Sequence, residues 1–166
     1  MIATSLRYAL CAALALGLPT AAFARDAQAA PAANTDAATR FANPDTLVAP
    51  NGYSHAVSVA AGRTVYVSGQ IAVNAKGELV GGNDVGAQAE QVFANLDTAL
   101  NAAGASFADV VKLTIYVTDM NQIKALRAAR DKRIDARRPP ASTAVEVSRF
   151  VKEGVLVEVD AIAVVR

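Results

Sequence analysis

The chain has 166 residues, with 16 basic and 15 acidic side chains and a single cysteine. This length suits one domain of ordinary size. The balanced charge argues against a general nucleic-acid binder, which needs clustered Lys and Arg to displace counterions from phosphates. Cys11 lies in a segment that we expect to be removed. A disulfide framework, a cysteine nucleophile and thiolate metal sites are therefore excluded from the mature chain.

The first 24 residues have the pattern of a secretory signal peptide. Arg7 gives a short positive region, and an uncharged apolar run follows from Tyr8 to Leu18. Ala22-Phe23-Ala24 then offers small residues at alternate positions for a signal peptidase. The apolar run is far shorter than the ~20 residues that a membrane span needs. We therefore expect cleavage after Ala24 and a secreted, periplasmic protein that is not held at a membrane.

Residues 25–49 are predicted to form a flexible tether, because they are rich in Ala and carry no sustained apolar period. The pattern then changes, and residues 50–166 are predicted to form one domain. The domain is predicted to begin with a β-hairpin, because two runs rich in Val and Ile flank a short turn. These runs are Ser54 to Ala60 and Thr64 to Val73. Polar residues and glycines from Asn74 to Gly82 indicate a loop or an irregular edge.

A helix and a third strand are predicted next. Asp84 can cap the helix and Gly104 can end it. The apolar residues of this helix recur every three or four positions, at Ala89, Val92, Phe93, Leu96, Ala99, Leu100 and Ala103. Val110 to Val117 then alternates as a strand does, with Val111, Leu113, Ile115 and Val117 on one face and Lys112, Thr114 and Tyr116 on the other.

The second half of the domain is predicted to hold one more helix and two strands. Asp119 or Asn121 can cap the helix, which is expected to continue to about Ala136 before two prolines prevent its extension. Strands are expected from Ser142 to Ser148 and from Val155 to Val165. The order ββαβαββ predicts an α+β fold with both helices on one face of a sheet.

Both faces of the last strand are largely apolar. Val155, Val157, Val159, Ala161, Ala163 and Val165 share one face, while Leu156, Glu158, Asp160, Ile162 and Val164 share the other. The helices can cover only one face of the sheet, so the other is expected to be buried by copies of the same chain. The pattern therefore predicts a homo-oligomer.

Several segments, taken in order, resemble the Rid family, whose members are also called YjgF-type or L-PSP endoribonuclease-like proteins. They are Gly52-Tyr53-Ser54-His55-Ala56-Val57, Val67-Ser68-Gly69-Gln70-Ile71, the first helix, Lys112 to Asp119, Arg138-Pro139-Pro140-Ala141, and Val157 to Ala163. The resemblance extends over essentially everything after Pro50.

This resemblance implies a chorismate-mutase-like fold, with an antiparallel-type sheet, two helices on one face, and assembly as a homotrimer with small-molecule clefts between subunits. Well-studied members hydrolyse reactive enamines and imines to 2-keto acids and ammonia. No metal or organic cofactor is implied, and no nucleic-acid partner is expected.

In Rid deaminases an arginine directly after the Pro-Ala pair binds the substrate carboxylate, and here that position is Ser142. One neutral hydroxyl cannot replace a bidentate guanidinium. Arg127 aligns where the family often has an asparagine near the cleft. It can supply a substitute charge, or it can be a solvated helical arginine near Asp131 at i+4.

The other candidate ligand and catalytic residues follow from the same resemblance. Glu158 matches the family carboxylate that orients or activates water, and it can instead be a structural acid satisfied by backbone or by Arg149. Tyr53 matches the cleft tyrosine that contacts the ligand, or it packs in the core. Ser68 and Gly69 can present a hydroxyl and backbone amides to a ligand, or they form a strand bulge.

His55 is the only histidine, and we expect it not to be an acid or base, because no carboxylate and serine accompany it in an identifiable triad. The sequence supports an exported trimeric hydrolase that acts on an imine, enamine or related small molecule. The alternative is a non-catalytic small-molecule-binding trimer. Ser142 favours this alternative or a changed substrate, whereas Tyr53, Ser68 and Glu158 favour a working cleft. Ribonuclease activity ranks last, because the mature chain without Arg7 is formally neutral and has no histidine pair.

Overall fold

The computed structural model describes residues 39–166. The predicted signal peptide, residues 1–24, and most of the predicted tether lie outside the described residues. Among the helices of the described part, none is both long enough and apolar enough to cross a membrane.

A four-stranded mixed sheet forms the centre of the fold, in the order β3-β6-β4-β5. These strands are β3 (Arg63–Ile71), β4 (Val110–Val117), β5 (Ala141–Glu146) and β6 (Val157–Val165). β6 runs antiparallel to both β3 and β4, whereas β5 runs parallel to β4. The expectation of an antiparallel-type sheet is therefore wrong for β5, because a helix connects β4 to β5 and returns the chain in the same direction.

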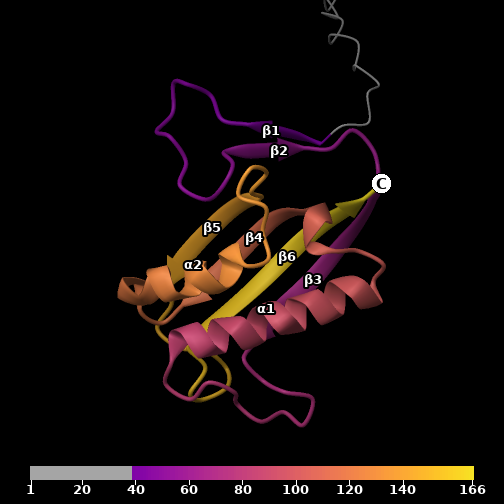
Figure 1. Ribbon diagram of the computed structural model, residues 1–166. Coiled ribbons are helices and arrows are strands. Elements are labelled where there is room, and N and C mark those ends of the chain that lie inside the picture. The colour runs from indigo at the N-terminus through magenta and orange to yellow at the C-terminus, as the bar shows by residue number, and fades with distance from the viewer. Residues whose placement is uncertain (1–38) are drawn as a thin grey trace, which may run out of the picture. The chain divides into compact units, whose positions relative to one another are not determined.

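Two helices, α1 (Val85–Ala102) and α2 (Ile123–Asp131), lie together on one face of this sheet (Figure 1). The predicted ends of α1 are confirmed. The carboxylate of Asp84 accepts hydrogen bonds from the backbone N–H groups of Gly86 and Ala87, at 2.7 and 3.1 Å. Beyond the helix, Gly104 adopts a positive φ of 66°, which a glycine reaches without a steric penalty.

The second helix is shorter than predicted, and it ends at Asp131 rather than near Ala136. The carboxylate of Asp135 accepts a hydrogen bond from the backbone N–H of Arg137, at 2.9 Å, and so closes a local turn that competes with helix. At the other end, Asp119 caps the short 3-10 helix η2 (Met120–Gln122) that precedes α2.

The predicted hairpin between Ser54–Ala60 and Thr64–Val73 is wrong. Strand β2 (Ala56–Ser58) pairs with β1 (Arg40–Ala42), not with β3. The reason is that Ser54 bridges to Ala141 at the start of β5, and β5 and β3 are opposite edges of the sheet. Strand β1 also lies inside the stretch predicted to be a tether, so ordered structure begins before residue 50 (Figure 1).

The hydrophobic core lies between the sheet and the two helices. On β6, Val157, Val159, Ala161 and Ala163 are at most 1% exposed, as their alternation predicts. They pack with Leu113, Ile115 and Val117 of β4 and with Val92, Phe93, Leu96 and Leu100 of α1. This arrangement confirms the α+β fold with two helices on one face.

The other side of the sheet is called here the open sheet face. It carries Thr64 and Tyr66 of β3, Thr114 and Tyr116 of β4, and Ile162 and Val164 of β6, by the register of the strands. Tyr66 is 78% exposed, and the β6 residues of this face are half-buried. Neither helix covers this face.

Candidate functional site

Three of the candidate ligand residues lie together at the edge of the sheet. Tyr53, Arg127 and Ser142 line one pocket of about 120 Å³ beside β5. Its other lining residues are Asn51, Ile115, Ile123, Arg130 and Ala144. Ser142 is paired with Leu113 of β4, so it lies on the helix-covered face and next to α2.

Tyr53 is positioned by the residue that follows it. Ser54 is almost fully buried, its backbone N–H donates to the carbonyl of Pro140 at 3.1 Å, and its hydroxyl donates to the carbonyl of Pro139 at 2.7 Å. These two bonds fix the loop before β2 against the start of β5. Tyr53 is half-buried and lines the pocket, rather than packing in the core.

His55 contacts Tyr53 but does not line the pocket. The two rings meet edge-on with centroids 5.5 Å apart. The Nε2 atom of His55 lies 2.8 Å from the carbonyl oxygen of Val48, and its backbone N–H donates to the side chain of Asn43 at 2.8 Å. These bonds give His55 a part in holding the loop that carries Tyr53.

Arg130 is a pocket residue that the sequence analysis missed. It is only 5% exposed, and its guanidinium pairs with the exposed carboxylate of Asp131 at 2.7 Å. A Cβ atom added to Gly52 would lie 2.5 Å from Nη2 of Arg130, so the absence of a side chain at Gly52 makes room for the guanidinium. The sequence contained one indication that Arg130 is buried. It follows Leu126 by four residues, so the two side chains lie on the same face of α2, and Leu126 is buried.

Arg127 lacks the partner that helical spacing predicts. Asp131 pairs with Arg130 instead, and within residues 39–166 the side chain of Arg127 makes no hydrogen bond or ion pair. The alternative of an Arg127–Asp131 pair is therefore wrong. We call Tyr53, Arg127, Arg130 and Ser142 the cationic half-site.

The remaining candidates form a second group, which we call the carboxylate half-site: Ser68, Gly69 and Glu158. The register of β3 with β6 shifts between Val67 and Gln70, so Ser68 and Gly69 do form a strand bulge. A Cβ atom added to Gly69 would lie 2.7 Å from Cδ of Glu158 and closer still to its Oε1. The glycine therefore allows the carboxylate to lie directly against the bulge.

The carboxylate of Glu158 has no hydrogen bond or ion pair within the described part of the chain, to Arg149 or to backbone. Its neighbours on the open sheet face include Tyr116, which is paired with it across β4 and β6. The hydroxyl of Tyr116 donates to Asp160 at 3.4 Å. The negative charge of Asp160, together with burial and the charge of Glu158, raises the pKa of Tyr116.

The two half-sites do not meet within one chain. The cationic half-site lies on the helix-covered face beside β5, whereas Glu158 lies on the open sheet face next to the bulge of β3. β3 and β5 are opposite edges of the sheet. The described residues also hold no group of three or more His, Cys, Asp or Glu side chains arranged to bind a metal ion.

Comparisons with known proteins agree with the fold. The family model for Endoribonuclease L-PSP matches residues 44–165. A RutC family protein from Pyrococcus horikoshii is 41% identical over 112 residues, which cover 67% of this chain and 85% of that protein. The 2-iminobutanoate/2-iminopropanoate deaminase of Escherichia coli is 39% identical over 108 residues, which cover 63% of this chain and 82% of that enzyme.

Solved structures give the same match. A Rid family protein of unknown function from Yersinia pestis superposes with a TM-score of 0.70 and 39% identity, over 76% of this chain and 98% of that one. RidA from a Psychrobacter species superposes with a TM-score of 0.57 and 37% identity, over 71% of this chain and 92% of that one.

Proposed function

The chain belongs to the Rid family, and on this premise we propose that it hydrolyses small reactive imines or enamines in clefts between copies of itself. In this reaction water adds to the imine carbon and the nitrogen leaves as ammonia, so that a carbonyl compound remains. An imine deaminase-like role is supported at the level of the family. The individual substrate and the residues that bind it are the proposal.

The assembly is proposed because one chain separates the residues that the chemistry needs. Positive charge is at the cationic half-site, and the carboxylate that orients or activates water is Glu158. A homotrimer would bury the open sheet face, where Tyr66 is exposed, and would bring the carboxylate half-site of one copy to the cationic half-site of the next. Each cleft would then contain both.

One observation carries the substrate proposal: two arginines line the pocket that also contains Ser142. Arg127 has no partner in the described chain, and Arg130 is buried against a single exposed carboxylate. A guanidinium removed from water binds a carboxylate strongly, because the hydrogen bonds are charge-assisted and can be bidentate. We propose that Arg127 and Arg130 hold an anionic substrate from the α2 side, whereas Ser142 contributes one neutral hydrogen bond.

With Ser142 at the position of the family arginine, the proposed substrate anion is still held by guanidinium groups. These groups are Arg127 and Arg130, and they reach the anion from α2 instead of from β5. In the proposed cleft, Glu158 accepts a proton from water as it attacks the imine carbon and returns it to the departing nitrogen. Tyr53 packs against the body of the substrate. The backbone N–H groups of the Ser68–Gly69 bulge face a polar group of the substrate.

The test uses 2-iminoacids generated in place by an amino-acid oxidase, with their hydrolysis followed by loss of the imine. We expect the chain to accelerate hydrolysis, and Arg127→Gln to raise KM by about ten- to a hundredfold, the range of one charge-assisted hydrogen bond. Lys124→Gln is the matched control, since Lys124 is an exposed cation on the same helix that does not line the pocket. It should leave KM unchanged.

Two results would contradict the proposal. Equal effects of Arg127→Gln and Lys124→Gln would remove Arg127 from the substrate site. No acceleration by an intact oligomer, with or without Ser142→Arg, would favour the alternative of a non-catalytic small-molecule-binding trimer, which the serine at position 142 supports. Light scattering measures the assembly separately, and a monomer would contradict the shared cleft.

We also propose that the domain is exported, on the N-terminal pattern alone. The expected product in a periplasmic fraction begins at Arg25, and mass spectrometry of the intact protein measures this directly. A protein that keeps residues 1–24 and stays with the cytoplasm would contradict export without affecting the proposed chemistry.

A further inference from the structure

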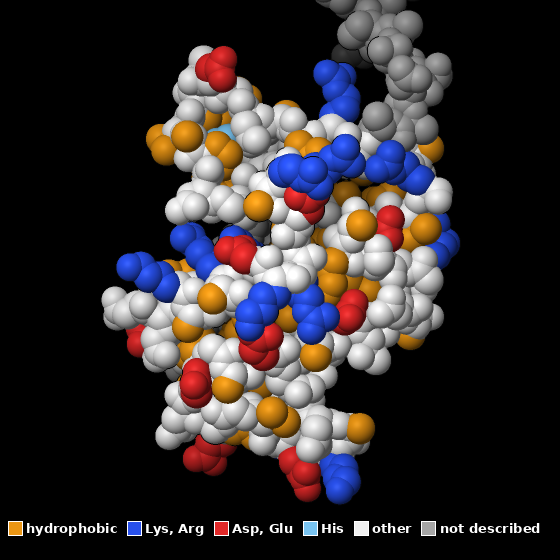
Figure 2. All heavy atoms as spheres, viewed as in Figure 1, with side chains coloured by type: hydrophobic (Ala, Val, Ile, Leu, Met, Phe, Trp, Pro, Cys, Tyr) orange, Lys and Arg blue, Asp and Glu red, His pale blue; other side chains and the backbone are white. Residues whose placement is uncertain are grey.

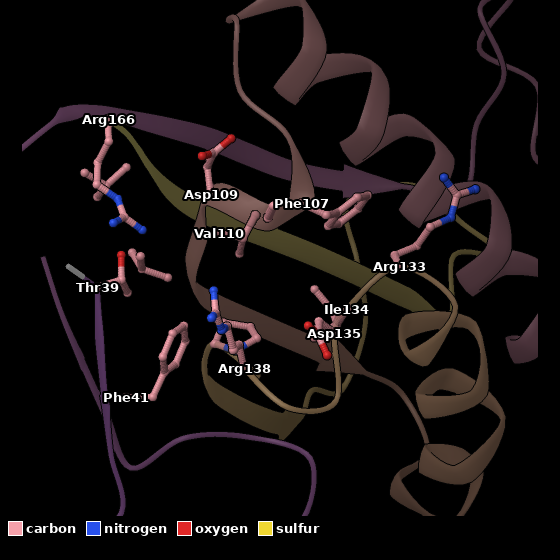
Figure 3. Close-up of a pocket in the computed structure, with 14 residues that line it drawn as sticks. Thr39, Phe41, Phe107, Asp109, Val110, Arg133, Ile134, Asp135, Arg138 and Arg166 are labelled. Atoms are coloured by element: carbon pink, nitrogen blue, oxygen red, sulfur yellow. The ribbon is translucent and has the colours of Figure 1, made fainter. Parts of the chain in front are cut away.

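A second and larger cavity, of about 380 Å³, is lined by the residues shown in Figure 3. It is bounded by β1, by the start of β4, by the segment that follows α2 and by the end of β6. None of the residues of the two half-sites lines it. Its volume is within the range of small-molecule sites, roughly 300–1,000 Å³, whereas the pocket of the cationic half-site is smaller.

The walls of this cavity are polar and apolar in about equal parts, and the apolar part includes flat rings. Phe41, Phe107 and Pro140 contribute rings, and Val110 and Ile134 contribute aliphatic surface. The ring of Phe107 also packs on that of Phe93 in the core, with centroids 6.2 Å apart, so this wall is fixed by the core. Such a surface suits a flat apolar molecule.

Arginines supply the polar groups that point into the cavity. Figure 3 shows the side chains of Arg138 and Arg166 directed toward each other and toward the ring of Phe41, whereas that of Arg133 turns away. The guanidinium of Arg138 makes no hydrogen bond or ion pair within residues 39–166. On the surface, Lys and Arg side chains gather around the β1–β2 pair and the C-terminal end of β6 (Figure 2).

Two carboxylates also line the cavity, but both are already engaged by groups outside it. Asp109 accepts hydrogen bonds from the backbone N–H and the hydroxyl of Ser106, at 2.9 and 2.8 Å. Asp135 accepts from the side chain and backbone of Arg137, and these bonds, with smaller contributions from the charges of Arg137 and Arg138, lower the pKa of Asp135 to about 2. Neither Ser106 nor Arg137 lines the cavity.

Beside its apolar rings, the cavity therefore has two engaged carboxylates and the exposed guanidinium of Arg138, which has no hydrogen bond or ion pair within residues 39–166. We propose that it binds a small organic anion with a flat apolar body. The anionic head, a carboxylate or a phosphate, accepts hydrogen bonds from Arg138, and the body lies against Phe41 and Phe107. This site is separate from the proposed cleft, and its occupation does not depend on imine hydrolysis.

Four probes test the proposal by isothermal titration calorimetry on the full chain: benzoate, phenyl phosphate, inorganic phosphate and benzyl alcohol. We expect benzoate or phenyl phosphate to bind at least tenfold more tightly than inorganic phosphate, which lacks the flat body, and than benzyl alcohol, which lacks the charge. The tighter of the two aryl anions identifies the head group. Backbone amide NMR shifts should map to Phe107–Val111 and Arg133–Arg138.

Two variants and a control connect binding to the cavity. Arg138→Gln is expected to weaken the aryl anion by about tenfold or more, as the loss of a charge-assisted hydrogen bond predicts. Arg149→Gln is the matched control, because Arg149 is exposed and lies outside the cavity. Phe41→Leu keeps β1 apolar but removes a ring, and it should weaken the aryl anion without affecting inorganic phosphate.

The proposal is overturned if neither aryl anion binds more tightly than benzyl alcohol. It is also overturned if Arg138→Gln and Arg149→Gln bind equally well, or if the NMR shifts map to Tyr53 and Ser142. The last outcome would assign the anion to the cationic half-site, and so separates this proposal from the proposed function.

Discussion

Replacing Gly69 by alanine tests whether the position of the Glu158 carboxylate matters for function. The added Cβ atom would lie 2.7 Å from Cδ of Glu158, whereas ordinary contact begins near 3.4 Å. The carboxylate must therefore move by about 1 Å or more. Gly69 does not have a positive φ, so alanine fits its backbone conformation, and the side chain that must move is flexible.

These facts predict a large effect on rate and a small one on stability. A misplacement of about 1 Å at a catalytic group costs on the order of a hundredfold in rate. Rotation of a half-buried glutamate changes the free energy of unfolding by less than about 1 kcal/mol. For Gly69→Ala we therefore expect kcat for 2-iminoacid hydrolysis to fall about a hundredfold while the urea unfolding midpoint stays nearly unchanged.

A double-mutant cycle with Glu158→Gln tests whether Gly69→Ala lowers kcat by displacing the Glu158 carboxylate. If Gly69→Ala acts by moving the carboxylate, it should have little further effect once Glu158 is replaced by glutamine. The kcat of the double variant should then match that of Glu158→Gln alone. Additive losses would show that Gly69 acts through something other than Glu158. A kcat equal to that of the unmodified chain would refute the role given to this carboxylate.

Two further predictions concern buried hydrogen bonding and titration. Gln88→Leu should lower the free energy of unfolding by about 3 kcal/mol, because the fully buried amide donates to Gly82 and Gly154 and accepts from Leu156, at about 1 kcal/mol for each bond. The control Gln91→Leu should cost less than about 1 kcal/mol in the same urea titration, since Gln91 bonds to one side chain. Asp160→Asn should lower the pKa of Tyr116 toward the ordinary value of about 10, because the charge that disfavours the phenolate is removed. Phenolate absorbance in a pH titration measures the shift.

Each of these two predictions has a measured outcome that would contradict it. Equal losses for Gln88→Leu and Gln91→Leu would mean that the buried amide does not link the loops before α1 and β6. An unchanged Tyr116 pKa in Asp160→Asn would mean that burial and the charge of Glu158, not the charge of Asp160, raise the pKa of this phenol.

Locally determined elements were predictable from the sequence. α1 begins at Asp84 and ends before Gly104, because a side-chain cap and a positive φ act within a few residues of the helix. β4 has the predicted bounds, and its side chains alternate as predicted from Lys112 to Val117. The prediction that Val111 faces the core is wrong, because the register shifts between Val110 and Lys112 and Val110 is buried instead. The early end of α2 was not predictable from periodicity, since the side chain of Asp135 competes for the backbone there.

Pairing between distant segments was the part that local patterns could not predict. Two neighbouring β-rich runs suggest a hairpin, but the bonds of Ser54 to Pro139 and Pro140 hold β2 near the opposite edge of the sheet from β3. The parallel pairing of β5 with β4 was not predictable for the same reason, because local patterns do not specify which strands pair or in which direction. Arg130 was missed because an arginine at a buried helical position looks like a break in the apolar pattern.

The segment from Arg138 to Ser142 forms a shared wall between two hollows. Arg138 and Pro140 line the larger cavity, and Ser142 lines the pocket of the cationic half-site. Pro139 and Pro140 each have a fixed φ, which restricts the conformations open to this wall. If a ligand on one side of the wall changes the affinity for a ligand on the other, linkage requires that the reverse effect have the same magnitude.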